Sequence, residues 1–336
     1  MSRTIDTHFH VVPTVFAQAV RDNKFREAVE VKVMNGMEHL VFHAPEGIPV
    51  EPHTELEPES YDPKLILEAL DRKKLDAAIM SPAPELFIYW IDAELGAKIA
   101  IDMNDAMADL AAKKPGRLYG LATLPLQDPD RSVRELERAV RQLGLVGAAI
   151  CTHVNGVTID AATIGPVFAA AQRLDVPLFL HPQNAGDLTR LHDYHLWNMV
   201  GFPYETALTA SRLLMSGTFE IYPRLKVILA HGGGYLPYQI GRLDHGYHAK
   251  RSLFANLPHP PSHYLTNMTC DGLVHDQLSL RFLIDRFGYE NVVLGCDYPF
   301  NMGTDEAVDS VRALGLPKEQ EDAIFGGNLA RLFNLR

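Results

Sequence analysis

The sequence predicts an α/β fold of the (β/α)₈ barrel type, and three observations support this. Short apolar runs alternate with longer segments of helical periodicity along the chain. Eight such runs can be counted, which is the strand number of that barrel. Several runs are apolar throughout, as expected for parallel strands buried on both faces. A doubly wound sheet can also contain eight strands, so the count alone leaves both architectures open.

The expected strands are short. They cover 4–11, 76–81, 117–123, 145–152, 176–181, 225–231, 267–272 and 291–297.

Helical segments occupy the intervals between these runs. The segment 62–75 carries apolar residues at helical spacing, and 128–144 starts with Asp-Pro and stops at a glycine. In 160–175, Pro166 predicts a first-turn proline or a break.

The segment 13–61 does not follow the alternation. It is rich in Pro, Glu and His and lies between the first strand and its helix. Insertions at this position usually lie over the mouth of the active site of such a barrel. We therefore expect a single domain over 1–336, with 13–61 as an insertion that covers the mouth.

The composition limits the kinds of molecule and cellular compartment that we expect for this protein. The net charge is −11 and no run of Lys or Arg offsets it, so we expect no nucleic-acid partner. No apolar run is long enough for a bilayer, and the N-terminus shows no signal-peptide pattern. The three cysteines, at positions 151, 270 and 296, are odd in number and widely spaced, which favours a reducing cytoplasm.

The candidate chemistry lies at the ends of the predicted strands. His8 and His10 end the first strand, His181 the fifth, His231 the sixth and Asp297 the eighth. Barrel enzymes place their chemistry at this edge of the sheet. Residues two apart on a strand point the same way, so His8 and His10 can reach one ion together.

Imidazoles with one carboxylate suit a catalytic divalent metal, and Zn²⁺ is the ion we expect. Any one of these histidines alone is more often a hydrogen-bonded, partly buried side chain. The coincidence of five candidate ligands or bases at matching strand ends instead favours a metal site.

Several motifs, in order, resemble the amidohydrolase superfamily, and within it the group of the 2-amino-3-carboxymuconate 6-semialdehyde decarboxylases. They are "IDTHFH", "LFLHPQN", "VILAHGGG" and "VVLGCDYPF", with "LATLPLQDPDRSVRELERAV", "VGFPYET" and "GGGYLPYQIGRLDHGY" between them. The likeness covers nearly the whole chain except 13–61.

The resemblance implies roles for the strand-end residues. His8, His10, His181 and Asp297 would hold the metal, and His231 would be the unliganded acid/base. Many family members bridge two metals through a lysine at the end of the fourth strand. Here that place reads "AICTHVN", so one metal is expected.

The resemblance also suggests how substrate is held. Arg242 would reach from one subunit into the site of its neighbour and hold a carboxylate of the substrate there. This implies a homodimer or a higher homo-oligomer. His43 stands where an arginine is expected, and Gln183 stands where a tryptophan is usual. Trp197 and Phe300 flank the predicted mouth and suit an unsaturated or aromatic acid.

These expectations combine into a metal-dependent, non-oxidative decarboxylase of a small unsaturated or aromatic carboxylic acid, with His231 and Asp297 handling protons. The same site could add water, as a hydrolase or hydratase of a ring-cleavage product. A non-catalytic, metal-stabilised binding protein is a third alternative, which His231 argues against.

Overall fold

Eight parallel strands form one sheet in the computed structural model, which describes residues 3–46, 52–184 and 190–335. The strand order is that of the sequence, β1-β5-β6-β7-β10-β11-β12-β13. The expected strands are thereby confirmed. Their bounds are β1 Ile5–Val11, β5 Ala77–Pro82, β6 Leu118–Ala122, β7 Gly147–Cys151, β10 Leu178–His181, β11 Val227–Leu229, β12 Met268–Asp271 and β13 Val292–Val293.

The sheet closes on itself through the residues after β13. The Thr7 amide donates to the Leu294 carbonyl at 3.2 Å, and the His10 amide donates to the Tyr298 carbonyl at 2.7 Å. These bonds join the last strand segment to the first, as a barrel requires. The (β/α)₈ barrel is therefore correct, and the doubly wound alternative is not.

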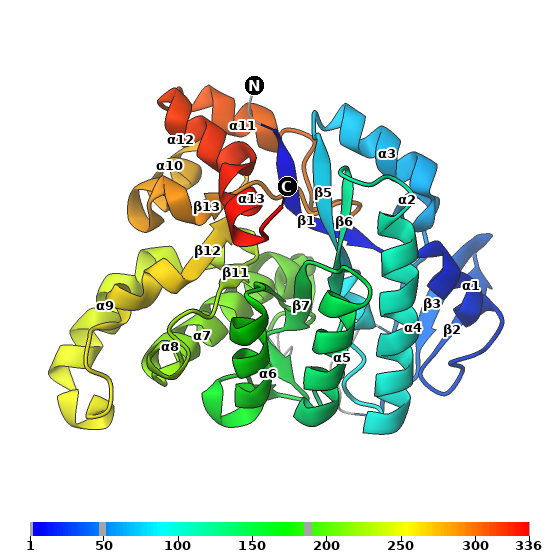
Figure 1. The fold of residues 1–336 in the computed structure, drawn as a ribbon, viewed down its shortest axis with the longest axis horizontal. Helices are drawn as coiled ribbons and strands as arrows, with labels where there is room; N and C mark the ends of the chain where they lie inside the picture. The colour runs from blue at the N-terminus through cyan, green and yellow to red at the C-terminus, as the bar shows by residue number, and fades with distance from the viewer. Residues whose placement is uncertain (1–2, 47–51, 185–189, 336) are drawn as a thin grey trace.

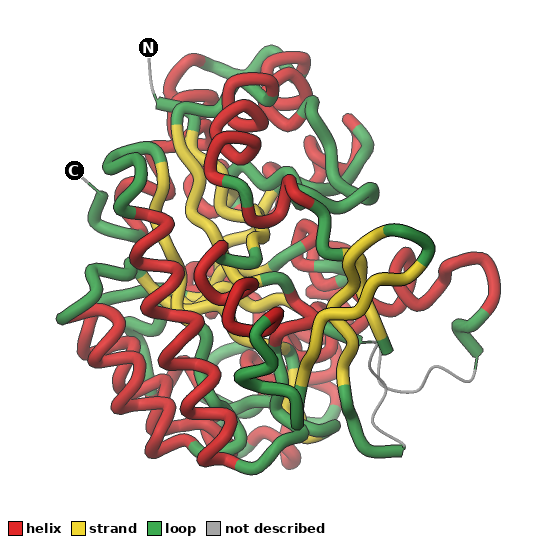
Figure 2. The backbone as a smooth tube through the Cα atoms, turned by 90° about the vertical axis from the view of Figure 1, so that its right-hand side faces the viewer, coloured by secondary structure: helices red, strands yellow, loops and turns green. Residues whose placement is uncertain are grey.

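Helices surround the strands, whose carboxyl ends face the lower side of Figure 1 (Figures 1 and 2). The segment 128–144 forms α5, which begins at Pro129 and is capped by Asp128, as its Asp-Pro predicted. The segment 160–175 forms α6, with a kink at Ile164 two residues before Pro166. The helices are α1 Thr14–Arg21, α2 Pro58–Tyr61, α3 Pro63–Arg72, α4 Ala93–Ala111, α5 Pro129–Arg141, α6 Ala161–Leu174, α7 Phe202–Met215, α8 Thr218–Ile221, α9 Leu236–Ala249, α10 Gln277–Phe287, α11 Ala307–Ala313, α12 Lys318–Asp322 and α13 Asn328–Leu332.

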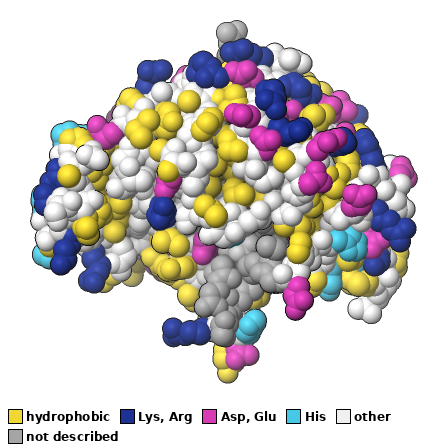
Figure 3. Space-filling view, turned by 90° about the horizontal axis from the view of Figure 1, so that it is seen from below, with side chains coloured by type: hydrophobic (Ala, Val, Ile, Leu, Met, Phe, Trp, Pro, Cys, Tyr) yellow, Lys and Arg dark blue, Asp and Glu magenta, His cyan; other side chains and the backbone are white. Residues whose placement is uncertain are grey.

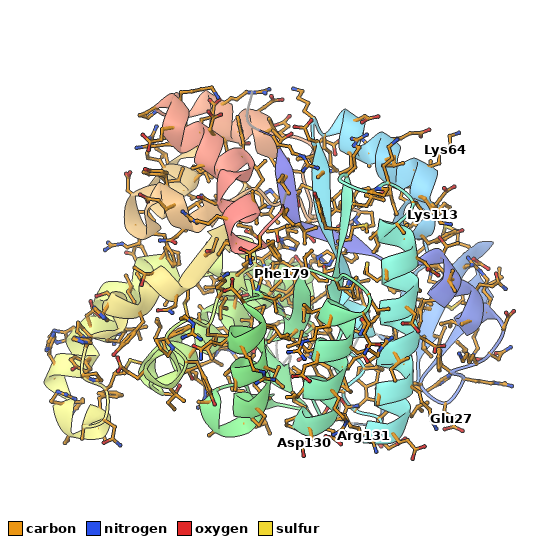
Figure 4. The ribbon with its side chains drawn as sticks, viewed as in Figure 1. Glu27, Lys64, Lys113, Asp130, Arg131 and Phe179 are labelled. Atoms are coloured by element: carbon orange, nitrogen blue, oxygen red, sulfur yellow. The ribbon has the colours of Figure 1, made fainter. Side chains whose placement is uncertain are left out.

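The core fills the barrel and the space between strands and helices. Phe179 of β10 is fully buried and lies among the strands in the middle of the molecule, whereas Lys64, Lys113 and Asp130 lie at its outer edge (Figure 4). Phe9 points into this core, where its ring stacks on that of Tyr298 at 4.2 Å.

The segment 13–61 has a structure of its own. Besides α1 and α2 it forms an antiparallel sheet of β2 Val29–Met34, β3 Met37–Phe42 and β4 His53–Glu55. Asn35 and Gly36 join β2 to β3 with φ of 54° and 84°, which is the two-residue hairpin turn that Asn-Gly favours. A second apolar cluster, with Phe16 and Leu40 in it, packs this unit against Met103 of α4.

Among the described residues, no helix combines the length and the apolar character that a membrane crossing needs.

Candidate active site

Four predicted residues converge at the carboxyl ends of the strands. His8, His10, His181 and Asp297 are all buried, and one nitrogen or oxygen atom from each lies within 4.8 Å of the others. Asp297 Oδ1 is 3.2 Å from His8 Nε2 and 3.3 Å from His10 Nε2. In the described part of the chain, this is the one cluster of His, Cys, Asp or Glu with such spacing.

The three histidines of this cluster are oriented by acceptors on their far side. His8 Nδ1 contacts Asp271 Oδ2 at 2.7 Å, His181 Nδ1 contacts the Pro182 carbonyl at 2.6 Å, and His10 Nδ1 contacts Ser81 Oγ at 2.9 Å and the Pro82 carbonyl at 3.4 Å. Carboxylates and carbonyls only accept, so Nδ1 of His8 and of His181 carries the proton, and the contact with the Pro82 carbonyl favours the same tautomer for His10. Nε2 of each ring is thereby left to face the cluster, which is how proteins orient histidine ligands of a metal.

Whether a cation fits the cluster can be judged from its polar atoms that have no hydrogen-bond partner. Within the described residues, Nε2 of His8, His10 and His181 and Oδ1 of Asp297 are buried and form no hydrogen bond. Buried polar atoms without partners are costly unless something else satisfies them. Three imidazole nitrogens and one carboxylate suit Zn²⁺ or another divalent first-row ion. The donor set therefore fits a single divalent metal.

His231 stands beside the cluster. It opens the short helical turn His231–Gly233 directly after β11, and its ring centroid lies 5.1 Å from that of His8 and 5.0 Å from that of His181. Its Nδ1 forms no hydrogen bond to the described residues. Both His231 and Asp297 have positive φ, 54° and 55°, in the region that non-glycine residues rarely adopt. Strained backbone conformations of this kind are concentrated at functional sites.

Burial and neighbouring charges set the protonation of the site. Burial, followed by the charge of His8, lowers the pKa of His231 to about 4. Burial also lowers the pKa of His10 and, more strongly, of His181. Burial opposes the charge on His8 as well, but the carboxylates of Asp297 and Asp271 outweigh it and raise the pKa of His8 to about 10. His231 is therefore a neutral imidazole near pH 7, able to accept a proton.

Asp271 is a site residue that the sequence analysis missed. Its Oδ2 accepts from His8 Nδ1 at 2.7 Å and from the His231 amide at 3.1 Å, and its Oδ1 accepts from the Gly232 amide at 2.9 Å. One buried carboxylate thus orients a cluster histidine and fixes the backbone of the free histidine. Asp271 ends β12, so the strand-end rule that found the other residues also applied to it.

A cavity of about 360 Å³ opens onto the cluster. Of the predicted substrate residues, Trp197, Phe300 and Gln183 line it, together with His231. The segment 13–61 also reaches the cavity, through residues of β3 and β4 that were not predicted. These are His39, His53, Thr54 and Glu55.

Two predicted substrate residues lie elsewhere. His43 does not line the cavity, and its Nε2 is 3.1 Å from the Glu30 carboxylate. Arg242 is exposed on α9 and does not line the cavity of its own chain either. Its expected contact is with substrate in a neighbouring subunit.

Comparison with known proteins agrees with this geometry. The family model described as "Amidohydrolase" matches residues 5–335. The 2-amino-3-carboxymuconate-6-semialdehyde decarboxylase of Dictyostelium discoideum is 33% identical over 285 residues, which cover 84% of this chain and 79% of that protein.

Two solved structures extend the comparison. The 5-carboxyvanillate decarboxylase of Sphingomonas paucimobilis superposes with a TM-score of 0.83 at 28% identity, covering all of both chains. A dihydroxybenzoic acid decarboxylase of Polaromonas sp. JS666, with bound manganese and the inhibitor 2-nitroresorcinol, gives 0.74 at 27% identity. That match covers 100% of this chain and 98% of the other.

All three proteins are decarboxylases, which supports the decarboxylase interpretation over the hydrolase alternative. The barrel, its strand-end cluster and these similarities lead to one assignment. The chain belongs to the amidohydrolase family.

Proposed function

We propose that this protein removes CO₂, without oxygen or an organic cofactor, from a small unsaturated or aromatic carboxylic acid at one divalent metal. The observation that carries the proposal is the set of four unpaired buried atoms facing His231 across the end of the barrel. His8, His10, His181 and Asp297 would hold the ion. When bound, it would supply positive charge that polarises an oxygen or nitrogen substituent of the substrate.

Decarboxylation breaks the bond between a carbon atom and its carboxylate and leaves an electron pair in the conjugated system. A proton must replace the carboxylate at that carbon. His231 is positioned to take up and deliver this proton, since it is neutral near pH 7 and lines the cavity. The Asp297 carboxylate would assist by stabilising the positive charge of the protonated His231.

The aromatic wall of the cavity supports a flat substrate. Trp197 packs edge-on against Phe202 at 5.3 Å, and the Phe202 ring stacks at 6.2 Å on His231. Phe300 lies 5.4 Å from His10 on another side. A planar ring between these groups would have its carboxylate near His231 and water excluded from the reacting carbon.

Zn²⁺ is the ion we propose for this site, on the basis of its histidine-rich donor set, although the Polaromonas enzyme holds manganese. Metal analysis of the purified protein, followed by reconstitution of the metal-free protein with each ion, tests the choice. Equal or higher activity with Mn²⁺, together with Mn²⁺ in the protein as isolated, would refute it.

We also propose that the working form is a cytoplasmic homodimer or higher homo-oligomer, in which Arg242 of one copy anchors the substrate carboxylate in the other. The exposed position of Arg242 on α9 supports this. Arg242→Gln should raise KM with little change in kcat, and sedimentation should show more than one chain per particle. A monomer with full activity would contradict the proposal.

The function itself is tested with candidate acids labelled at the carboxyl carbon. The metal-loaded protein should release trapped ¹³CO₂ under anaerobic conditions, and His231→Ala should not. Turnover of these acids with the label retained in the product would indicate water addition instead.

A further inference from the structure

The residues that follow β13 form a loop with one member of the cluster near its start. We call 296–305 the β13 loop; it contains Asp297, and its residues 300–302 line the cavity. The two ends of the loop are joined, since the Thr304 amide donates to the Cys296 carbonyl at 2.9 Å. The place of Asp297 therefore depends on what holds these joined ends, which form the base of the loop.

The backbone around Asp297 is closely packed within the β13 loop. The Asp297 amide donates to the His8 carbonyl at 2.8 Å, and the Phe300 amide donates to the Asp297 carbonyl at 3.0 Å. Gly303 lies directly against this turn. A β-carbon at Gly303 would lie only 2.5 Å from the Cys296 carbonyl oxygen and 2.6 Å from that of Asp297. A displacement at the base of the loop would be passed on to Asp297, because such packing leaves no free space.

Lys73 contacts the base of the β13 loop with a buried ammonium group. Lys73 directly follows α3, and its side chain is only 6% exposed. Its Nζ donates to the Thr304 carbonyl at 2.8 Å and to Asp305 Oδ1 at 2.6 Å. The same nitrogen lies 5.8 Å from the centre of the Tyr298 ring, within the range of a cation–π contact. All three contacts lie in the β13 loop.

The burial of Lys73 makes these contacts important for the loop. A buried ammonium is costly unless it is paired and hydrogen-bonded. The hydrogen bond from Lys73 lowers the pKa of Asp305, so this carboxylate is ionised at neutral pH. Arg72 also pairs with Asp305, at 3.1 Å, but its side chain is 56% exposed, and exposed pairs contribute little. Lys73 is therefore the main restraint that α3 places on the loop.

Lys73 acts from outside the cavity. Among the described residues that line the cavity there is no Lys or Arg. On the face at the carboxyl ends of the strands, Lys and Arg side chains lie mainly toward the periphery (Figure 3). Any influence of Lys73 on the site must therefore pass through the β13 loop.

We propose that Lys73 is a positioning residue for Asp297: it fixes the base of the β13 loop and thereby sets where this carboxylate stands in the cluster. The inference rests on the metal site of the proposed function, but not on the reaction. None of the motifs that indicated the family includes Lys73.

The test replaces Lys73 by methionine, which keeps the aliphatic chain and removes the ammonium. Competition with a chromophoric chelator gives the Co²⁺ affinity of the metal-free protein, and we expect a loss of about tenfold, as for groups that orient a ligand. The visible absorption bands of bound Co²⁺, which report the geometry of its ligands, should also change. Lys73→Arg should restore both, since a guanidinium can donate to the same carbonyl and carboxylate.

Lys74→Met is the matched control. Lys74 is the next residue, but it is exposed and pairs with Asp309, outside the β13 loop. Its replacement should leave the affinity and the spectrum of bound Co²⁺ unchanged. Urea denaturation of the metal-free proteins measures stability separately. A Lys73→Met protein that is less stable but has unaltered Co²⁺ affinity and spectrum would overturn the inference, because Lys73 would then be a purely structural residue.

If Lys73→Met does not fold, Asp305→Ala decides, because it removes the carboxylate from the half-exposed side of the contact. We expect Co²⁺ binding to weaken about threefold, less than for Lys73→Met, since the Thr304 carbonyl keeps its hydrogen bond. Unchanged affinity in that case would overturn the inference.

The same measurements separate this inference from the proposed function. An unmodified protein that binds no Co²⁺ would refute the metal site and the inference together. Equal affinity in the unmodified and Lys73→Met proteins would refute the inference alone, and the release of CO₂ from labelled acids would still decide the function.

Discussion

The cluster at the barrel end and the wall of β3 and β4 border one cavity but are built in different ways. In the cluster, four side chains from three separate strand ends are buried, and each histidine is oriented by a hydrogen bond on its far side. The wall comes from a local antiparallel sheet, and His53 and Glu55 on it are exposed. The main barrel therefore carries the cluster, while the segment 13–61 contributes one side of the cavity.

The largest effect should follow removal of the free histidine. His231→Ala should lower kcat by about 10²–10⁴-fold, because the proton for the product carbon loses its donor. Metal content should remain at one ion per chain, since His231 is not among the four converging residues that we propose as ligands. If His231→Ala lost the metal, or kept full activity with the metal in place, the assignment of His231 as an acid/base that does not bind the metal would be wrong.

Acid should destabilise the folded protein through His231. The folded pKa of His231 is about 4, below the ordinary 6.5, so the unfolded chain binds more protons between these values. Stability therefore falls as the pH drops from 6.5 toward 4, by up to about 3 kcal/mol from this residue. His8, with a raised pKa, acts in the opposite sense and loses its contribution as the pH rises from 6.5 to 10.

The measurement is chemical denaturation of the metal-free protein from pH 7 to 4, compared with His231→Asn. The variant should show a shallower loss of unfolding free energy across this range. An identical slope would mean that other groups account for the acid sensitivity.

A smaller effect is expected for Asp271, which acts through His8. Asp271→Asn places an amide where His8 Nδ1 needs an acceptor, and we expect metal affinity to fall about 10–100-fold. Competition with a chromophoric chelator measures this directly. Asp285→Asn, at an exposed position on α10, is the matched control and should bind metal normally. Unchanged affinity in Asp271→Asn would show that His8 is held by the sheet alone.

The smallest effects should distinguish His39 from His43, two of the three histidines of the segment 13–61. His43→Ala should change kcat/KM less than threefold, because His43 pairs with Glu30 outside the cavity. His39→Ala should raise KM for the acid substrate severalfold with kcat little changed. If His43→Ala had the larger effect, the assignment of His39 rather than His43 to the cavity would be wrong.

The difference between the cluster and the side of the cavity formed by β3 and β4 also explains which site residues could be predicted from the sequence. Strand ends are local signals, so His8, His10, His181, His231 and Asp297 could be placed together once the barrel was recognised. Asp271 obeyed the same rule and was overlooked. The wall could not be placed, because its facing residues depend on how the hairpin of Asn35 and Gly36 docks on the barrel. The alignment pointed to His43, which follows β3 and does not line the cavity, whereas His39 within β3 does.

The central claim is that CO₂ leaves and a proton takes its place at the same carbon. The most direct test runs the reaction with a hydroxybenzoate in D₂O enriched in D₂¹⁸O and analyses the product by mass spectrometry. Corrected for exchange in product incubated alone, each turnover should release one CO₂ and add one deuterium, with no ¹⁸O in the ring product. A product that keeps its carboxyl carbon and gains ¹⁸O would contradict the account.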